Sequence, residues 1–182
     1  MLHFVNAKLI DPEAGTVTHG TLRVEGGQIT AILPEDAPIP GDSTIVDCRG
    51  KYLAPGIVDL GVKVCEPGER HKESFRSAGL AAAAGGVTTM VTRPDTNPTI
   101  DSPEVLEFVT RRANEAAPVN VVPMAALTKG REGREMTEIG FLMDAGAIAF
   151  TDCDRVITDT KVFSRALTYA RSLGALVLAY PH

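Results

Sequence analysis

The sequence predicts an α/β protein in which a parallel sheet is covered by helices. Five nearly all-apolar runs alternate with stretches of helical character. Three of the junctions repeat one pattern, with Gly85-Gly86, Gly146 or Gly174 placed between a helical stretch and an apolar run. Glycine adopts the left-handed backbone that commonly ends a helix, and strands buried on both faces are apolar throughout. These observations together favour parallel strands joined by helices.

The first 51 residues differ from the rest and are predicted to form an N-terminal β-sandwich segment. Apolar and polar residues alternate from Val5 to Leu9, and turn residues occupy 11–15 and 26–27. Further short strands are expected at 21–25, 28–33 and 45–48, with a proline-rich loop at 34–42. So few strands bury little apolar surface, so this segment is not expected to be stable alone.

Residues 52–182 form the second predicted domain, with alternating strands and helices. Ser102 is the expected N-cap of one helix, with proline at the first helical position. The expected strands are 57–64, 87–92, 119–125, 147–151 and 176–179, and the expected helices are 72–84, 103–116, 135–144 and 161–172.

Composition narrows the class of protein. The chain has 182 residues, of which 44% are hydrophobic and 23% charged, as in ordinary globular proteins. A net charge of −5 argues against a nucleic-acid or anionic-membrane partner. No apolar run is long enough to span a membrane, and the N-terminus lacks the features of a signal peptide. Three widely spaced cysteines are typical of a reducing compartment, so we expect a cytoplasmic protein.

Several ordered motifs carry a family resemblance. The first strand of the second domain begins in the frame Pro55-Gly56-x-x-Asp59, and no glycine-rich phosphate loop follows it, which argues against a Rossmann fold. Downstream motifs are Glu66-Pro67-Gly68, His71-Lys72-Glu73, Ala82–Thr89, Pro94-x-Thr96-Asn97-Pro98, Leu127–Gly133, Glu138-Ile139-Gly140 and Ala145–Phe150. This series resembles the dihydroorotase family of cyclic amidohydrolases. The resemblance implies a (β/α)₈ TIM barrel preceded by a small N-terminal β segment.

The length fits only part of such a barrel. A complete barrel takes roughly 250 residues, whereas the second domain, 52–182, holds about five strands. We expect a partial barrel that stops after the fifth strand, because the chain is a truncated piece of a longer polypeptide. Closure by a second copy or a partner is the alternative.

The positions at which the family holds zinc carry other residues here. The resemblance places the four ligands at Gly61, Lys63, Cys153 and Tyr180. Glycine has no donor atom, and an ammonium has no lone pair. A zinc hydrolase needs about three protein ligands and an open position. We therefore predict no catalytic residue, no bound metal and a pseudo-dihydroorotase.

Two positions that the resemblance assigns to substrate binding also carry residues different from those usual in the family. Cys65 stands where the family usually has an arginine that grips the substrate carboxylate, and a thiol cannot replace that fork. Asp95 stands where the family commonly has asparagine. From these comparisons with the family pattern, we predict a remnant pocket rim that consists of Lys63, Cys65, Arg93, Asp95, Asp152 and His182.

Two hypotheses describe what this rim does. In the first, Lys63 and Arg93 neutralise Asp95 and Asp152, so that internal ion pairs replace the charge of a metal. In the second, weaker one, Cys65, Cys153 and His182, with Asp152 nearby, form a new zinc site, although no Cys-x-x-Cys spacing supports it.

Two other segments have structural interpretations. His71 is expected to serve local loop or cap structure rather than catalysis. The basic, glycine-containing stretch 129–134 is expected to be a solvated loop rather than an anion site.

The resemblance leaves two functions open. The favoured one is a catalytically inactive dihydroorotase-like protein that serves pyrimidine biosynthesis as a non-catalytic structural partner of aspartate carbamoyltransferase, within an oligomer. It would need no cofactor. The alternative is an active zinc-dependent hydrolase that opens dihydroorotate to N-carbamoyl-aspartate.

Overall fold

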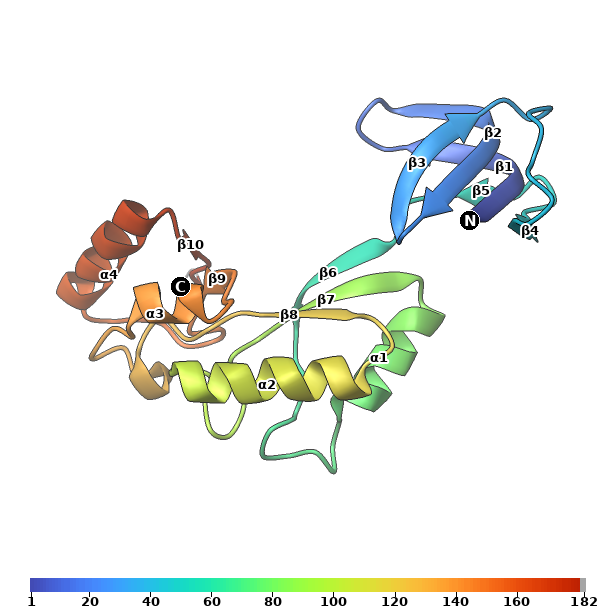
Figure 1. Cartoon of the computed structure of the whole chain (residues 1–182). Helices are drawn as coiled ribbons and strands as arrows, with labels where there is room; N and C mark the ends of the chain where they lie inside the picture. The colour runs from blue at the N-terminus through green and yellow to red at the C-terminus, as the bar shows by residue number, and fades with distance from the viewer. Residues whose placement is uncertain (181–182) are drawn as a thin grey trace. The chain divides into compact units, whose positions relative to one another are not determined.

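The computed structural model describes residues 1–180 and divides into two compact units, with the boundary after Pro55 (Figure 1). The division lies four residues beyond the expected one. The strand β5 (Tyr52–Leu53) causes this difference, because it pairs with β1 (Leu2–Asp11) in the first unit. Within the described residues, no helix has the length and apolar character that crossing a membrane requires.

The first unit is a single five-stranded sheet. Its strand order is β3-β2-β1-β4, where β2 spans Thr16–Glu25, β3 spans Gln28–Leu33 and β4 spans Thr44–Asp47. The first three strands are antiparallel, whereas β4 and β5 run parallel to β1. Alternate residues of β1, namely His3, Ala7 and Leu9, are buried, as the period of a strand requires. Residues 1–55 thus form one five-stranded sheet, and the predicted sandwich remains a prediction.

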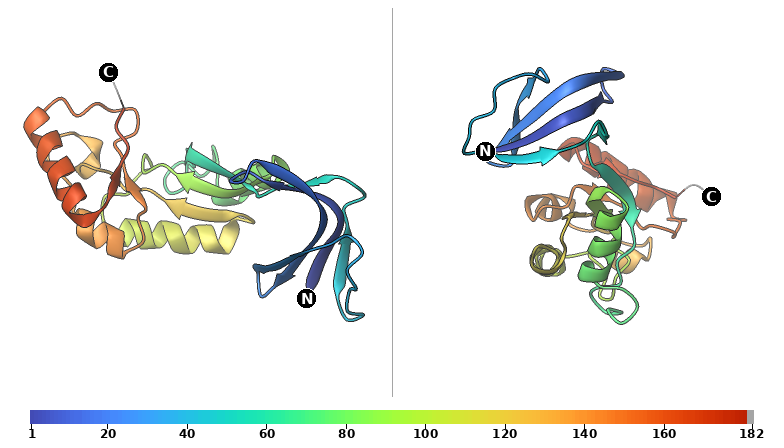
Figure 2. Two further views of the ribbon diagram at one scale, coloured as in Figure 1. Left: turned by 90° about the horizontal axis from the view of Figure 1, so that it is seen from above. Right: turned by 90° about the vertical axis from the view of Figure 1, so that its right-hand side faces the viewer.

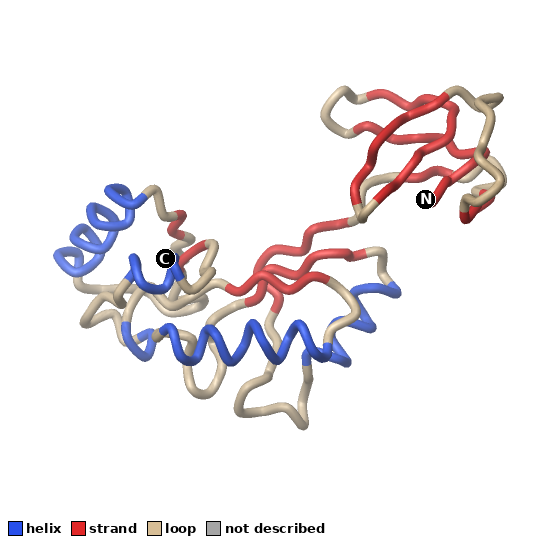
Figure 3. Tube along the Cα trace, in the orientation of Figure 1, coloured by secondary structure: helices blue, strands red, loops and turns tan. Residues whose placement is uncertain are grey.

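The second unit alternates strands and helices, which confirms the predicted α/β class (Figure 3). The strands are β6 (Ile57–Val62), β7 (Val87–Thr92), β8 (Asn120–Pro123), β9 (Ala149–Phe150) and β10 (Leu176–Val177). The helices are α1 (Phe75–Ala84), α2 (Pro103–Ala116), α3 (Ile139–Asp144) and α4 (Thr160–Leu173), with a short 3₁₀ turn at Lys129–Arg131.

The five strands of this unit run parallel in chain order. The strands β6, β7 and β8 form one sheet, and β9 pairs with β10. A bridge between Ala125 and Phe150 joins the two sheets. The amide of Thr151 donates to the carbonyl of Ala125 at 2.9 Å, and that of Leu178 donates to Phe150 at 2.9 Å. This order is the first part of a (β/α) barrel, as predicted.

The core of the unit lies between the strands and the helices that cover them. The helix α1 packs on β7, α2 packs on β8, and the two helices contact each other (Figure 2). Phe75, Leu106 and Phe150 are among the side chains with at most 1% exposure. Full burial of such side chains contributes about 1.5–3 kcal/mol each, so the helical layer and the sheet stabilise one another.

The outer strand β6 is open. Among the described residues it pairs with β7 alone, and Val58 and Leu60 are 56% and 72% exposed. An edge strand with exposed apolar side chains is what a partial barrel leaves uncovered.

Two helices begin later than the sequence predicted. Residues 72–74 precede α1, and Ser74 caps it by accepting a hydrogen bond from the Ser77 amide. The segment before α3 is extended rather than helical, because Glu135 accepts from the Lys129 amide and the Thr137 amide donates to Leu127. In both cases backbone groups that a helix would use are bonded elsewhere. Helix α2 has the predicted bounds, with Ser102 at the N-cap position.

Glu66 fixes the loop between β6 and α1. This carboxylate is buried and accepts hydrogen bonds from the Phe75 amide at 3.0 Å and from Nε of Arg112 at 2.8 Å. Burial alone raises the pKa of Glu66, but the hydrogen bonds and the charges of Arg112 and Arg70 outweigh it, so the pKa lies below its ordinary 4.5. One side chain therefore joins the first loop to α1 and α2.

We predict that Glu66→Gln lowers the free energy of unfolding by about 1–3 kcal/mol at neutral pH, because a buried, charge-assisted interaction is lost. The folded-state pKa of Glu66 is lowered, so its contribution is present above the unfolded-state pKa and is lost as the pH falls through the folded-state value. Denaturant unfolding measures both effects when it is carried out from about pH 3 to about pH 7, a range that includes the ordinary pKa of a glutamate carboxyl group.

Glu69→Gln is the matched control. Glu69 pairs with Lys72 at the surface, so its substitution is expected to change stability far less. Equal effects of the two substitutions, or a Glu66→Gln effect that does not fade in acid, would contradict this assignment.

Candidate functional site

The carboxyl ends of the parallel strands bring polar side chains to one edge of the second unit. Lys63 follows β6, Arg93 and Asp95 follow β7, and Asp154 lies in the loop after β9. The amide of Arg93 donates to the carbonyl of Val62 at 2.9 Å, which continues the β6–β7 ladder by one residue. Neighbouring positions on two strands therefore carry two cations, Lys63 and Arg93.

Asp95 lies between these two cations. Its side chain is only 3% exposed, and its Oδ2 is 3.0 Å from Nζ of Lys63 and 2.8 Å from Nη2 of Arg93. Nε of Arg93 donates to Oδ1 at 3.1 Å, so the guanidinium binds the carboxylate with two nitrogens. This bidentate geometry is the strong form of an arginine–carboxylate pair. The predicted ion pairs of Lys63 and Arg93 with Asp95 are present.

A second carboxylate extends the ion pairs to the loop after β8. Nη2 of Arg131 donates to Oδ1 of Asp154 at 2.6 Å, and Nη2 of Arg93 is 3.7 Å from the same oxygen. The hydrogen bond of Asp154 to its own amide and the charges of Arg131, Arg93 and Lys63 outweigh a small effect of burial and lower the pKa of Asp154. We call these five residues, Lys63, Arg93, Asp95, Arg131 and Asp154, the charge cluster.

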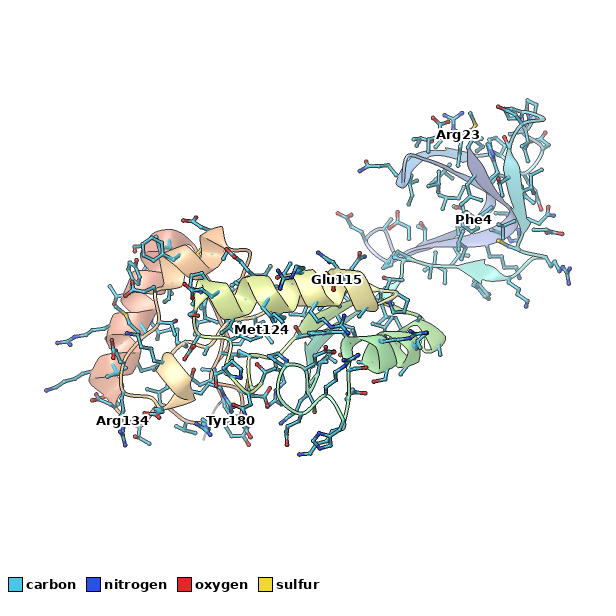
Figure 4. The ribbon with its side chains drawn as sticks, turned by 60° about the horizontal axis from the view of Figure 1, so that its bottom comes forward. Phe4, Arg23, Glu115, Met124, Arg134 and Tyr180 are labelled. Atoms are coloured by element: carbon cyan, nitrogen blue, oxygen red, sulfur yellow. The ribbon has the colours of Figure 1, made fainter. Side chains whose placement is uncertain are left out.

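A pocket of about 230 Å³ borders the charge cluster. Met124 and Tyr180, both labelled in Figure 4, line it together with Gly61, Arg93, Thr151, Cys153, Asp154 and Leu178. Burial raises the pKa of the Cys153 thiol, and Asp95 raises it further, against the opposing effect of Arg93 and Arg131. The thiol is therefore neutral at neutral pH.

Gly61 has a backbone that suits glycine alone. Its φ is +85°, and the β6–β7 register shifts between Leu60 and Val62, which marks a bulge at this residue. A side chain at such a φ is strained even though a Cβ would meet open space. Gly61, the first expected ligand position, thus has no donor atom, and its backbone conformation disfavours any residue that would provide one.

Asp152 does not face the two cations, and this part of the first hypothesis is wrong. Its buried carboxylate accepts the amides of Leu127 and Thr128, each at 3.0 Å, and the hydroxyl of Thr128. Among residues 1–180, no cationic group lies within ion-pair distance of this carboxylate. The backbone amides satisfy it instead, so Asp152 holds the loop after β8 against the end of β9.

The alternative zinc site is not assembled in the described part of the chain. Cys65 lies in the turn whose carbonyl accepts from the Glu69 amide, and it does not line the pocket that Cys153 lines. His182 lies outside the described residues. Within residues 1–180, no three His, Cys, Asp or Glu side chains form a group able to hold a metal.

The basic stretch 129–134 is only partly solvated, in contrast to the expectation. Arg131 is 9% exposed and also donates through Nε to the Asp152 carbonyl at 3.2 Å. Arg155 donates to the carbonyls of Gly130 and Arg131, which ties the stretch to the loop after β9. His71 is exposed in the turn before α1, as its loop assignment requires.

The predicted rim did not include three residues that the structure places at this site, namely Thr151, Asp154 and Arg131. Asp154 follows its strand by four residues, and Arg131 lies on a different loop, so only the fold brings them together. The one available signal was the position of Asp154 in the loop after the fourth barrel strand, where such barrels place functional groups.

The donor set does not fit the zinc ion that the family uses. Gly61 offers no atom, and the Lys63 ammonium is engaged by Asp95. Cys153 is the one strong donor among the four positions, and a single thiol falls short of the three protein ligands that a zinc hydrolase needs. Tyr180 is a phenol with 55% exposure. A divalent cation here would also face Lys63 and Arg93, so no chemical step is assigned to a metal.

The strand order and the position of the pocket define a class of protein, the first part of a (β/α) barrel with its polar groups at the carboxyl ends of the strands. The family model described as dihydro-orotase-like matches residues 50–182. The chain belongs to this dihydro-orotase-like family.

Curated relatives agree with this assignment. The chain is 37% identical to a dihydroorotase of Syntrophus aciditrophicus over 95% of its length and 41% of that protein. It is 39% identical to a dihydroorotase-like protein of Pseudomonas putida over 97% of its length and 42% of that protein. The chain thus spans about two fifths of the length of these relatives.

A solved structure shows the same fold. The L-hydantoinase (dihydropyrimidinase) of Arthrobacter aurescens superposes with a TM-score of 0.83 at 20% identity, over 98% of this chain and 40% of that one. This likeness supports the amidohydrolase type of barrel and the partial coverage of it.

We predict that Asp95→Asn lowers the free energy of unfolding by about 2–4 kcal/mol, because Lys63 and Arg93 then face each other without a buried carboxylate. Asp154→Asn is the control, since Asp154 is 68% exposed and an exposed pair contributes under about 1 kcal/mol. Denaturant unfolding of the two variants measures the difference. If Asp95→Asn is no more destabilising than Asp154→Asn, Asp95 does not hold the charge cluster together.

Proposed function

We propose that this protein is a non-catalytic member of its family, in which an ion-paired cluster occupies the place of a metal centre. One observation supports the proposal above the others. The position expected to provide a zinc-binding histidine provides Lys63, whose ammonium is 3.0 Å from the buried Asp95. Opening a cyclic amide in this family needs a metal to lower the pKa of water toward neutrality. An ammonium bound to a carboxylate cannot act as that ligand.

The neighbouring positions strengthen the argument. Restoring a histidine at residue 61 would require a side chain at a φ of +85°. Asp95 holds a negative charge where the anionic substrate dihydroorotate would need a neutral or positive group, and its partners Lys63 and Arg93 are already engaged. Several linked changes would be needed to recover hydrolysis, and a single one would not suffice.

We propose that the protein serves pyrimidine biosynthesis as a structural partner of aspartate carbamoyltransferase, within a hetero-oligomer in the cytoplasm. The family resemblance is the basis for this partner. A chain without the metal ligands of its family but with a buried apolar core still presents a folded surface to which another subunit can bind.

We predict that the full polypeptide carrying this sequence purifies without stoichiometric zinc and does not turn over dihydroorotate, with or without added zinc. The double variant Gly61→His, Lys63→His is also expected to bind no zinc tightly, because residue 61 has a left-handed backbone and Cys153 and Tyr180 remain. Metal analysis by mass spectrometry and a dihydroorotate assay measure these outcomes. Stoichiometric zinc with turnover by the unmodified protein would establish the alternative, an active zinc-dependent dihydroorotase.

We predict that aspartate carbamoyltransferase from the same organism forms a stable complex with the full polypeptide. Size-exclusion chromatography with light scattering measures the complex, and the thermal stability and activity of the transcarbamoylase measure its consequence. Both quantities are expected to rise in the complex. Asp154→Asn is a control that leaves the core intact and should still form it. Separate elution of the two proteins at micromolar concentration, with unchanged transcarbamoylase stability, would contradict the proposed partner.

A further inference from the structure

The charge cluster has one more cation than carboxylates. Lys63, Arg93 and Arg131 provide three positive charges, and Asp95 and Asp154 provide two negative ones, so the difference is 3 − 2 = +1.

The neighbouring charges occur in opposite pairs. Glu69 interacts with Lys63 but is itself paired with Lys72, so these two residues add no net charge. Asp152 and Arg155 line a separate cavity of about 210 Å³ beside α4. One is a carboxylate and the other a guanidinium, so including both leaves the sum at +1. Asp152 is also already bound by two backbone amides.

Hydrogen-bond donors remain at the pocket beside the excess charge. The two bonds of Arg93 to Asp95 use Nε and Nη2, which leaves Nη1 for another acceptor. The neighbouring acceptor is the sulfur of Cys153, which is a weak one. The hydroxyl groups of Thr151 and Tyr180 belong to the same pocket wall.

We propose that this pocket binds a small monovalent inorganic anion, of the size of chloride or bicarbonate, beside Arg93. The inference rests on the proposed function, since a divalent metal at this place would change the charge balance. A single negative charge neutralises the cluster, and the half-buried position of Arg93, 27% exposed, makes that neutralisation stronger than at the surface. The volume of about 230 Å³ accommodates such an ion with some of its water.

The size and the charge argue against larger anions. A phosphate near neutral pH carries more than one negative charge, and it needs more donors than Arg93, Thr151 and Tyr180 provide. Asp154, whose carboxylate lines the same pocket, repels a doubly charged anion more strongly than a singly charged one. The anion would stabilise the fold by binding the folded state alone.

The test is chloride-35 NMR line broadening with the full polypeptide, titrated with chloride and then competed with bicarbonate. Saturable broadening is expected for the unmodified protein. Tyr180→Phe removes one donor and should weaken chloride binding roughly tenfold, as for a hydrogen bond to a charged group. Asp154→Asn raises the net charge of the cluster to +2 and should strengthen binding several-fold.

Arg23→Met is the matched control, because it removes a surface ion pair with Glu25 in the first unit, and neither residue lines the pocket. It should leave the broadening unchanged. Arg93→Met should abolish saturable broadening. If circular dichroism shows that this variant is unfolded, the opposite effects of Tyr180→Phe and Asp154→Asn on chloride binding still test the proposal. Equal broadening in the unmodified protein, Tyr180→Phe and Asp154→Asn would overturn the proposal.

Metal analysis of the same samples separates the two proposals. Metal-free protein without saturable broadening overturns the anion site alone and leaves the non-catalytic assignment in place. Protein with stoichiometric zinc, whose broadening disappears on chelation, overturns both. Metal-free protein with saturable broadening and opposite effects of Tyr180→Phe and Asp154→Asn supports both.

Discussion

The buried carboxylate of Asp95, held between Lys63 and Arg93, is the interaction on which the arrangement of the site depends. Its side chain is 3% exposed, and a carboxylate this deep is costly unless cations and hydrogen bonds compensate it. The two cations come from adjacent parallel strands, β6 and β7, and Arg93 extends the contact to Asp154. The loops after three strands are thus joined by charge, at the place where the resemblance expects the metal of the family.

The strand geometry makes this interaction possible. Residues that follow neighbouring parallel strands lie side by side, and the hydrogen bond from the Arg93 amide to Val62 keeps Lys63 and Arg93 in register. The bulge at Gly61 changes the register immediately before Lys63. Glu66 then fixes the next turn to α1 and α2, so the loop that carries Lys63 is held at both ends.

The sequence predicted the elements well and their junctions less well. Apolar runs and helix-ending glycines located the five parallel strands, because those signals are local. The starts of α1 and α3 were predicted too early. The Ser74 hydroxyl caps α1 by accepting from the Ser77 amide, and the residues before α3 bond to the loop after β8. The pairing of Asp95 with Lys63 and Arg93 followed from their positions at strand ends. The contacts of Asp152 with backbone amides did not, because they depend on the conformation of a loop far along the chain.

We propose that ion pairs stand where the family has a metal centre. Crystals of the full polypeptide grown with zinc, measured on both sides of the zinc absorption edge, test it most directly. We expect continuous density from Lys63 through Asp95 to Arg93, with no anomalous peak at the ends of β6, β9 and β10. A strong anomalous peak there, with Asp95 turned away from Lys63, would contradict it.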